Sequence, residues 1–427
     1  MRRIRGTPDS GGMSATIGFF IGFAAVSLFG VTATKIKEFM PVGPTLIGFL
    51  IAAPALSGSL LRIPFAAWTD TNGGRKPFLV LLMLSIFGMT GLSLAMSRFY
   101  PDHLSGSSYP LFLLLGILCG CGIATFSVGI GQVSYWFPQK RQGTVLGLYA
   151  GLGNLAPGIF ALILPFAVKK LGLPSTYLAW LSFLVIGTFI YWLLGRNAWY
   201  FQLVEQGVSP AEARREAQER FHQEIFPKGD VKQSLQVSAR NWKTWALVSI
   251  YFATFGGFIA LTAWFPTYWV SFYKMDLVRA GMLTALYSIS ASLVRIIGGR
   301  ISDVYGGERT LLFSLLVMTS GALVMFVSDS FVLSIIGCIL LAIGMGVSNA
   351  SVFKLVPQEV PEAIGGAAGW VGGLGALGGF IIPPLMGYAV SVIGQDGYRK
   401  GFGLLAAFAV IALSLTFVLK SQRRVQS

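Results

Sequence analysis

The chain has 427 residues, of which 54% are hydrophobic and only 11% are charged. Soluble domains carry roughly a quarter of charged residues, so this composition excludes a soluble globular protein. The net charge of +15 is typical of proteins that bind nucleic acid. Here, however, the basic residues are scattered over short loops between apolar segments. That distribution fits the orientation bias of a membrane protein, and we expect no nucleic-acid partner.

Twelve apolar segments follow one another along the chain, each long enough to cross about 30 Å of hydrocarbon. The first follows a basic N-terminus without a small-residue cleavage site, so we expect a retained helix rather than a signal peptide. The predicted spans are 13–34, 44–68, 77–98, 109–137, 143–167, 174–195, 243–273, 279–302, 310–328, 331–356, 364–391 and 399–419. The sequence therefore predicts an all-α, multi-pass protein of the cytoplasmic membrane, surrounded by lipid.

A polar segment divides the spans into six and six. We expect an N-terminal bundle over 1–196, a linker over 197–242 and a C-terminal bundle over 243–427. Within the linker, Ser209 and Pro210 suit the N-cap and first position of a surface helix. If both termini and the linker are cytoplasmic, the inner loops hold more than twice as many Lys and Arg residues as the outer loops. The positive-inside rule favours that orientation.

Two stretches of the first half recur in the second half. "SLLRIPFAAWTDTNGG" from Ser59 matches "SLVRIIGGRISDVYGG" from Ser292, and "GTVLGLYAGLGNL" from Gly143 matches "GGAAGWVGGLGAL" from Gly365. Both pairs lie six spans apart, which predicts two parallel, pseudo-symmetric six-helix bundles. Glycines four residues apart allow close helix packing. Their density here suggests packing that also slides, and we assign gating positions to Gly151, Gly153, Gly373 and Gly375.

The first repeat places one arginine, Arg62 or Arg295, inside a hydrophobic span of each half. An arginine at such a depth costs at least about 2.5–3.5 kcal/mol. All acidic residues fall in loops or at span ends, so we expect that no carboxylate is buried and that the two arginines have no carboxylate partner. The two arginines are therefore predicted to bind an anionic substrate together, because the planar guanidinium fork suits a planar oxyanion. Asn154, whose second-half counterpart is Ala376, is predicted to add a hydrogen bond that breaks the symmetry.

The loops "DTNGGRKP" and "DVYGGERT" resemble the cytoplasmic signature of the major facilitator superfamily. "GLYAGLGNLAPG" and "GGAAGWVGGLGALGG" resemble the two glycine-rich signatures of its nitrate/nitrite porter family. The resemblance implies that Arg62 and Arg295 clamp the anion and that Asn154 hydrogen-bonds it. Further roles are implied for an aromatic wall and for signature charges that latch the two halves. The wall comprises Phe126, Tyr251 and Phe255, and the signature charges are Asp70, Arg75, Asp303 and Arg309.

The function implied by the resemblance is transport of nitrate and nitrite by a monomer, with no cofactor. A transporter of another small monovalent anion, such as formate or a small carboxylate, is the alternative. An enzyme is disfavoured because both histidines lie in loops and no metal or nucleophile cluster appears. Coupling stays open between nitrite exchange and proton symport. For symport, Lys354 near the end of span ten is the candidate proton carrier, although a snorkelling lysine would look the same.

Overall fold

The computed structural model describes residues 4–227 and 231–426, which fold into helices and connecting loops. Twelve helical segments in these residues are long and apolar enough to cross a membrane, as the sequence predicts. The first six spans are built from α1 (Pro8–Phe23), α2 (Leu28–Phe39), α3 (Pro44–Leu60), α4 (Arg62–Asn72), α5 (Arg75–Phe99), α6 (Tyr109–Cys119), α7 (Thr125–Trp136), α8 (Gln142–Gly153), α9 (Leu155–Leu171) and α10 (Leu173–Leu194). The last six are built from α14 (Trp242–Tyr251), α15 (Gly257–Phe272), α16 (Leu277–Tyr305), α17 (Gly307–Val327), α18 (Phe331–Glu359), α19 (Ile364–Leu374), α20 (Gly378–Ile393), α21 (Gly397–Lys400) and α22 (Phe402–Gln426).

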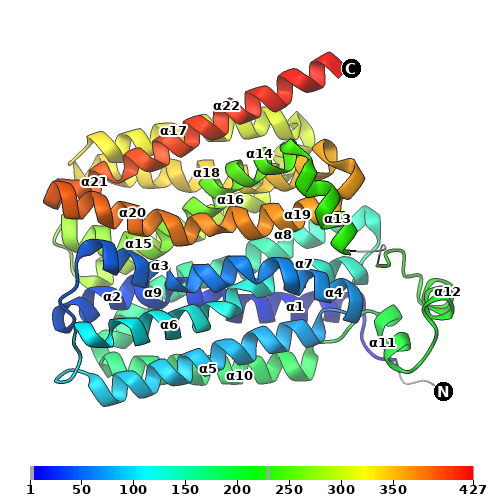
Figure 1. Cartoon of the computed structure of the whole chain (residues 1–427), viewed down its shortest axis with the longest axis horizontal. Coiled ribbons are helices and arrows are strands. Elements are labelled where there is room, and N and C mark those ends of the chain that lie inside the picture. The colour runs from blue at the N-terminus through cyan, green and yellow to red at the C-terminus, as the bar shows by residue number, and fades with distance from the viewer. Residues whose placement is uncertain (1–3, 228–230, 427) are drawn as a thin grey trace.

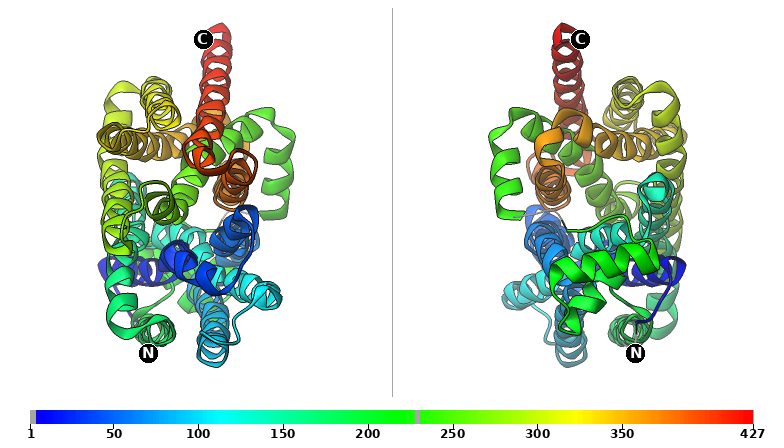
Figure 2. Two further views of the ribbon diagram at one scale, coloured as in Figure 1. Left: turned by 90° about the vertical axis from the view of Figure 1, so that its left-hand side faces the viewer. Right: turned by 90° about the vertical axis from the view of Figure 1, so that its right-hand side faces the viewer.

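The two groups of six spans form two bundles that lie side by side. Viewed along the spans, the blue and cyan helices gather in one group and the yellow, orange and red helices in the other (Figure 2). Where the groups meet, α3 packs along α20 and α9 packs along α16. At the end away from the termini, the Thr45 and Ser391 hydroxyls are 3.0 Å apart across this boundary. The two-bundle architecture predicted from the internal repeats is confirmed.

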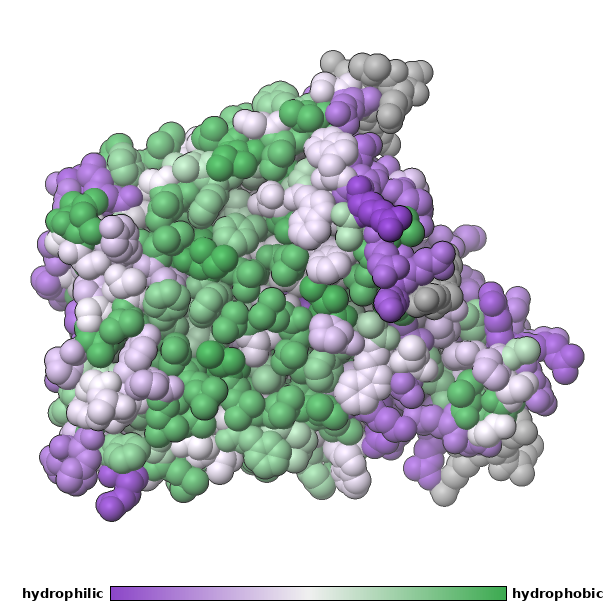
Figure 3. Space-filling view, in the orientation of Figure 1, coloured by the Kyte–Doolittle hydropathy of each residue, from purple (hydrophilic) through white to green (hydrophobic). Residues whose placement is uncertain are grey.

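Both described ends of the chain and the segment between the bundles lie at one end of the molecule (Figure 1). A hydrophobic band covers the middle of the face in Figure 3, and hydrophilic residues concentrate at the end that carries the central segment. A membrane-spanning protein shows this division between an apolar belt and polar ends. We refer to the end that carries the termini as the terminal end. That this end faces the cytoplasm remains a prediction from the positive-inside rule.

The central segment contains three short helices rather than the single surface helix that we expected. They are α11 (Trp199–Glu205), α12 (Pro210–Phe221) and α13 (Val231–Arg240). The predicted start of α12 is confirmed, because Ser209 accepts a hydrogen bond from the Glu212 amide (3.4 Å) and Pro210 opens the helix. α11 and α12 share a small apolar cluster that includes Leu203 and Ala213. This part of the linker therefore packs into an ordered unit.

Several spans are interrupted near their middle. Span one is broken at Ala24–Ser27, span four at Gly120–Ala124 and span eleven at Gly375–Leu377, each by a short 3₁₀ turn. Span two changes from α3 to α4 at Leu61, and span five changes from α8 to α9 at Asn154. Span seven contains a π-helical turn over Phe252–Gly256. Interruptions of this kind recur at functional sites, because they change the direction of side chains and free backbone groups.

Candidate functional site

Arg62 is the first residue of α4, at the break in span two, and its side chain is completely buried. Its Nε donates to the Gly58 carbonyl (3.1 Å) in the same span. One terminal nitrogen donates to the Gly372 carbonyl (2.9 Å), on α19 in the other bundle. The other terminal nitrogen has no hydrogen-bond partner in the described part of the chain. Arg62 therefore joins the two bundles and keeps one unsatisfied donor.

Arg295 lies in the uninterrupted helix α16, and 8% of its surface is exposed. One terminal nitrogen lies 3.4 Å from the Tyr251 hydroxyl, a long contact that leaves the guanidinium weakly held. The other terminal nitrogen is buried and finds no partner among the described residues. Each bundle thus contributes one buried arginine with one orphaned nitrogen. Leaving a buried hydrogen-bond donor unpaired costs free energy, so binding of a group that accepts hydrogen bonds from these nitrogens is favoured.

The two guanidinium groups lie over the same two aromatic rings. The Arg62 Cζ is 4.8 Å from the ring centre of Phe126 and 5.1 Å from that of Phe255. For the Arg295 Cζ the corresponding distances are 5.7 and 5.3 Å. The two rings are stacked, with centres 5.9 Å apart. The negative faces of aromatic rings offset part of the repulsion between two buried cations. The structure brings together the arginines and the aromatic residues predicted from the sequence.

Tyr251 directly precedes the π-helical turn in span seven and Phe255 lies within it, and their rings stack with centres 4.8 Å apart. A further ring that we did not assign to the site, that of Phe353 in α18, packs edge-on against Tyr251 at 5.1 Å and against Phe126 at 6.4 Å. Phe353 belongs to the stretch "NASVFKLVP". One phenylalanine in an apolar span carries no signal of its own, which explains why it was missed. The rings of Phe126, Tyr251 and Phe255 are at most 1% exposed, so the site is closed to solvent.

Asn154 lies at the break between α8 and α9 and is 1% exposed. Its backbone carbonyl accepts a hydrogen bond from the Ser292 hydroxyl (2.9 Å). Ser292 precedes Arg295 by about one helical turn, so this bond connects the break in span five to the helix that carries the arginine. The side-chain oxygen Oδ1 has no partner in the described residues. The side chain of Asn154 is therefore buried beside α16, and its amide oxygen is left as an unpaired acceptor.

Among the described residues no carboxylate lies within ion-pair distance of Arg62 or Arg295. The broader expectation that no carboxylate is buried is wrong. The side chain of Glu359, at the end of α18, is 1% exposed and forms an ion pair with Lys243 (2.8 Å). Sequence position placed Glu359 at a span end, where exposure is usual. α14, which carries Lys243, and α19 pack against α18, and sequence position alone does not reveal such cover.

The four predicted gating glycines lie on the interrupted spans five and eleven, and close contacts surround them. A Cβ atom added to Gly375 would lie 2.8 Å from the Cβ of Tyr251, and one added to Gly373 would lie 2.7 Å from the Ile63 side chain. A Cβ atom on Gly151 would lie 2.5 Å from Ile296, and one on Gly153 would overlap the ring of Phe19. In this state Gly153 and Gly375 leave no room for a side chain, whereas at Gly151 and Gly373 the isoleucine side chains would have to shift. Gly375 connects the glycine-rich span directly to the aromatic wall.

The signature loops lie apart from the arginines, at the terminal end. Both have the same backbone form, because Gly73 (φ 75°) and Gly306 (φ 87°) adopt the left-handed conformation that glycine favours. Asp70 accepts a hydrogen bond from Tyr135 (2.6 Å), and the Arg75 side chain donates to the Trp192 carbonyl (2.9 Å). Both partners lie in the first bundle, so these contacts do not join the two bundles in this state.

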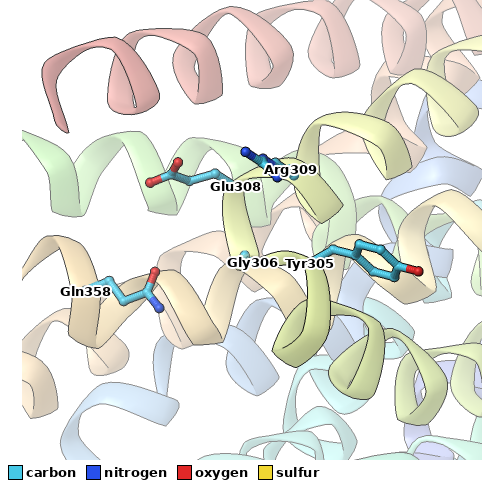
Figure 4. Close-up of a pocket in the computed structure, with 6 residues that line it drawn as sticks. Tyr305, Gly306, Glu308, Arg309 and Gln358 are labelled. Carbon is cyan, nitrogen blue, oxygen red and sulfur yellow. The ribbon is translucent and has the colours of Figure 1, made fainter. Parts of the chain in front are cut away.

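The second signature loop is held differently. Lys354 in α18 donates to the Asp303 carboxylate (2.7 Å) and to the Ser302 carbonyl (2.6 Å). Glu308 and Arg309 lie in the first turn of α17 and line a cavity of about 230 Å³ with Tyr305 and Gln358. In Figure 4, Glu308 and Gln358 lie on one side of this cavity and Tyr305 on the other. Lys354 is therefore paired with a carboxylate of the signature loop itself.

Comparison with known proteins fits this architecture. The family model described as Major Facilitator Superfamily matches residues 15–383 and 275–427. The chain belongs to the major facilitator superfamily. The xylose transporter XylE from E. coli has the same fold, with a TM-score of 0.71 at 14% identity over 96% of this chain and 99% of that one. The human organic anion transporter MFSD10 superimposes with a TM-score of 0.66 at 15% identity, over 96% of this chain and 100% of that one.

Two relatives indicate to which part of the superfamily this chain is most similar. The chain is 30% identical to the "Probable nitrate/nitrite antiporter NarK1" of Thermus thermophilus, over 96% of this chain and 92% of the relative. It is 28% identical to the "Probable nitrate transporter NarT" of Staphylococcus epidermidis, over 93% of both. The resemblance to nitrate/nitrite porters of the superfamily is confirmed. This major facilitator is a multi-pass protein of the cytoplasmic membrane, and the relatives it matches are transporters.

Proposed function

We propose that this protein transports nitrate and nitrite across the membrane by alternating access, with the anion held between Arg62 and Arg295. The observation that supports the proposal is the pair of buried guanidinium groups, one from each bundle, over the same two rings. Each keeps one orphaned nitrogen. A planar oxyanion presents acceptors that could satisfy both nitrogens and would neutralise part of the paired positive charge.

The two arginines come from different bundles, so binding of the anion is linked to closure of the bundles. Bringing two like charges together and away from water costs several kcal/mol per ion in real proteins. A bound anion offsets much of this cost, so closure of the two bundles is favoured when the site is loaded. A ligand that binds the closed state better than the open states shifts the population toward the closed state.

We further propose that the Asn154 amide donates to the anion and that Phe126, Tyr251 and Phe255 form the wall around it. Asn154 exists only in the first half of the repeat, so a single amide serves one small ligand. The relatives named as nitrate transporter and nitrate/nitrite antiporter support nitrate and nitrite as the substrates. Formate and small carboxylates are also monovalent and planar, and they are the competitors to test.

Inward transport of an anion must be coupled to the movement of a second ion. The reason is that moving one anion inward costs about 2.3 kcal/mol per 100 mV of inside-negative potential. We propose exchange of nitrate for nitrite, because no buried carboxylate accompanies the two arginines among the described residues. Proton symport through Lys354 is the second candidate. Its 2.7 Å contact with the Asp303 carboxylate equally suits a structural latch.

Counterflow in proteoliposomes tests the proposal. Vesicles loaded with nitrite, at zero membrane potential and without a pH gradient, should accumulate labelled nitrate, whereas empty vesicles should not. Formate added in excess outside should leave this uptake unchanged. If uptake requires a pH gradient, the transporter is a proton symporter and not an exchanger. If formate inhibits uptake at the same concentration as unlabelled nitrate does, the site accepts small monovalent anions in general and is not specific for nitrate.

A further inference from the structure

Three arginines converge on a cavity at the terminal end, whose lining includes neither Arg62 nor Arg295. Arg5 comes from the N-terminal segment, Arg75 from the start of α5 and Arg196 from the turn between α10 and α11. The cavity has a volume of about 480 Å³. Its remaining lining residues are Asn197, Gln202, Glu205 and Gln206. With one acid against three arginines, the lining carries two net positive charges.

The protein holds the backbone of each arginine in place. The Gln202 side chain accepts from the Arg5 amide (3.0 Å) and donates to the Arg5 carbonyl (2.7 Å). Asn197 accepts from the Arg75 amide (2.9 Å). The Arg196 carbonyl accepts from the side chains of Gln132 (3.0 Å) and Trp136 (3.2 Å). The backbones of three arginines are thus held around one space, so their like charges stay close together.

The electrostatic cost of this arrangement is visible at Arg196. Burial lowers the pKa of its guanidinium below the ordinary value, and the nearby charges of Arg75 and Arg5 lower it further. At Arg75, Nε is buried and has no hydrogen-bond partner among the described residues. Like charges held together with an unsatisfied donor are expected where an anion completes the site.

The position of the cavity indicates the class of anion. The Arg75 side chain donates to the Trp192 carbonyl (2.9 Å) in the last turn of α10. Trp192, Leu193 and Leu194 are about half exposed there and present an apolar surface, as expected for residues facing lipid. A phosphate group suits a cluster of guanidinium forks, and basic pockets at the ends of spans are known places for lipid headgroups.

We propose that the cavity formed by Arg5, Arg75 and Arg196 binds the phosphate group of an anionic ligand, supplied by an anionic phospholipid or by free phosphate. Arg75 belongs to the signature loop, so the occupant would contact the element that we assign to gating. An occupant that binds one state of the carrier better than the other would shift the balance between them. This site is separate from the transport site, and the proposal does not depend on the identity of the transported anion.

The test measures thermal unfolding of the purified full-length chain in detergent during titration with one of three ligands. These are a short-chain phosphatidylglycerol, the matching phosphatidylcholine and inorganic phosphate. The variant is Arg5→Gln/Arg196→Gln, which leaves the signature residue Arg75 intact. The control Lys140→Gln/Arg215→Gln removes the same charge from two exposed residues outside the cavity. If the double variant fails to fold, Arg5→Gln alone serves, because the backbone contacts of Arg5 remain.

We expect phosphatidylglycerol to raise the unfolding temperature of the wild-type and control proteins. The cavity variant should require a roughly ten- to hundredfold higher lipid concentration, as expected for lost hydrogen bonds to a charged group. Stabilisation by inorganic phosphate, lost in the cavity variant, would also support the site and identify a soluble source. Phosphatidylcholine should have little effect. The proposal is overturned if the cavity and control variants respond alike, or if neither phosphatidylglycerol nor phosphate stabilises the wild-type protein.

Discussion

Arg62 in the first bundle donates a hydrogen bond to the backbone carbonyl of Gly372 in the second, at 2.9 Å. The bond joins a buried charge to the glycine-rich span without using a carboxylate. A carbonyl is a weaker partner for a guanidinium than an anion, because charge-assisted hydrogen bonds with both partners ionised are the stronger class. A substrate anion could therefore compete for this arginine, whereas a permanent salt bridge would resist competition. The contact holds the bundles together and leaves the site available.

The first prediction concerns the shape of the charged group. Arg62→Lys and Arg295→Lys should each abolish most nitrate transport although the charge is kept, because lysine lacks the planar fork. Uptake into proteoliposomes measures the effect, and size-exclusion chromatography checks folding. The matched control is Arg300→Lys, at an exposed position on the same helix as Arg295, which should transport normally. Near-normal rates in either site variant would rule out the clamp.

The second prediction concerns Asn154. Asn154→Ala should raise the apparent nitrate dissociation constant roughly ten- to hundredfold, because a hydrogen bond to a charged group contributes about 1.5–3 kcal/mol. The Ser292 contact uses the Asn154 backbone, so the variant keeps it and should fold. Binding of labelled nitrate to purified protein measures the change. An unchanged dissociation constant for both nitrate and nitrite would remove Asn154 from the binding site.

The third prediction concerns the glycine-rich span. Gly375→Ala would place a Cβ atom 2.8 Å from that of Tyr251, whereas Gly369→Ala would approach only Leu235, at 3.5 Å. Overpacking costs about 1–3 kcal/mol, so Gly375→Ala should lower the transport rate roughly tenfold. Gly369→Ala lies on the same span and should behave like the wild-type protein. Equal rates for the two variants would mean that the contact with Tyr251 does not limit transport.

The fourth prediction separates the two roles considered for Lys354. If its pair with Asp303 is a latch, Lys354→Met and Asp303→Asn should change transport in the same direction. The exchanged pair Lys354→Asp/Asp303→Lys should then recover it. Neither change should alter stability by more than about 1 kcal/mol, because Asp303 is largely exposed. Uptake at several external pH values gives the second readout. If the transport rate depends on pH in the wild-type protein but neither in Lys354→Met nor in the exchanged pair, the result would favour Lys354 as a proton carrier.

The sequence predicted the spans, the repeat and the meeting of Arg62 with Arg295, because these rest on hydropathy and on charges that hydrocarbon does not tolerate. The π-helical turn after Tyr251 and the ring of Phe353 were not predictable. A local change in helix geometry leaves no clear mark in composition, and an apolar ring looks alike on any face of a span. The burial of Glu359 was missed for a related reason. Position near a span end indicates exposure only where no other element covers that end.

The last prediction concerns how the empty carrier behaves. Without an anion, Arg62 and Arg295 remain two buried like charges over shared rings. Among the described residues they have no carboxylate partner. Since desolvation costs several kcal/mol per ion, closure around an empty site should be slow. Nitrate efflux from preloaded vesicles should therefore be slow into anion-free buffer and fast when nitrite or nitrate is supplied outside.

Both efflux measurements are made at one pH and at zero membrane potential, and vesicles with the Arg62→Lys variant report passive leakage. Equal efflux into both buffers would exclude obligatory exchange. The return of the empty carrier, coupled to a proton on Lys354, would then be the better account of transport.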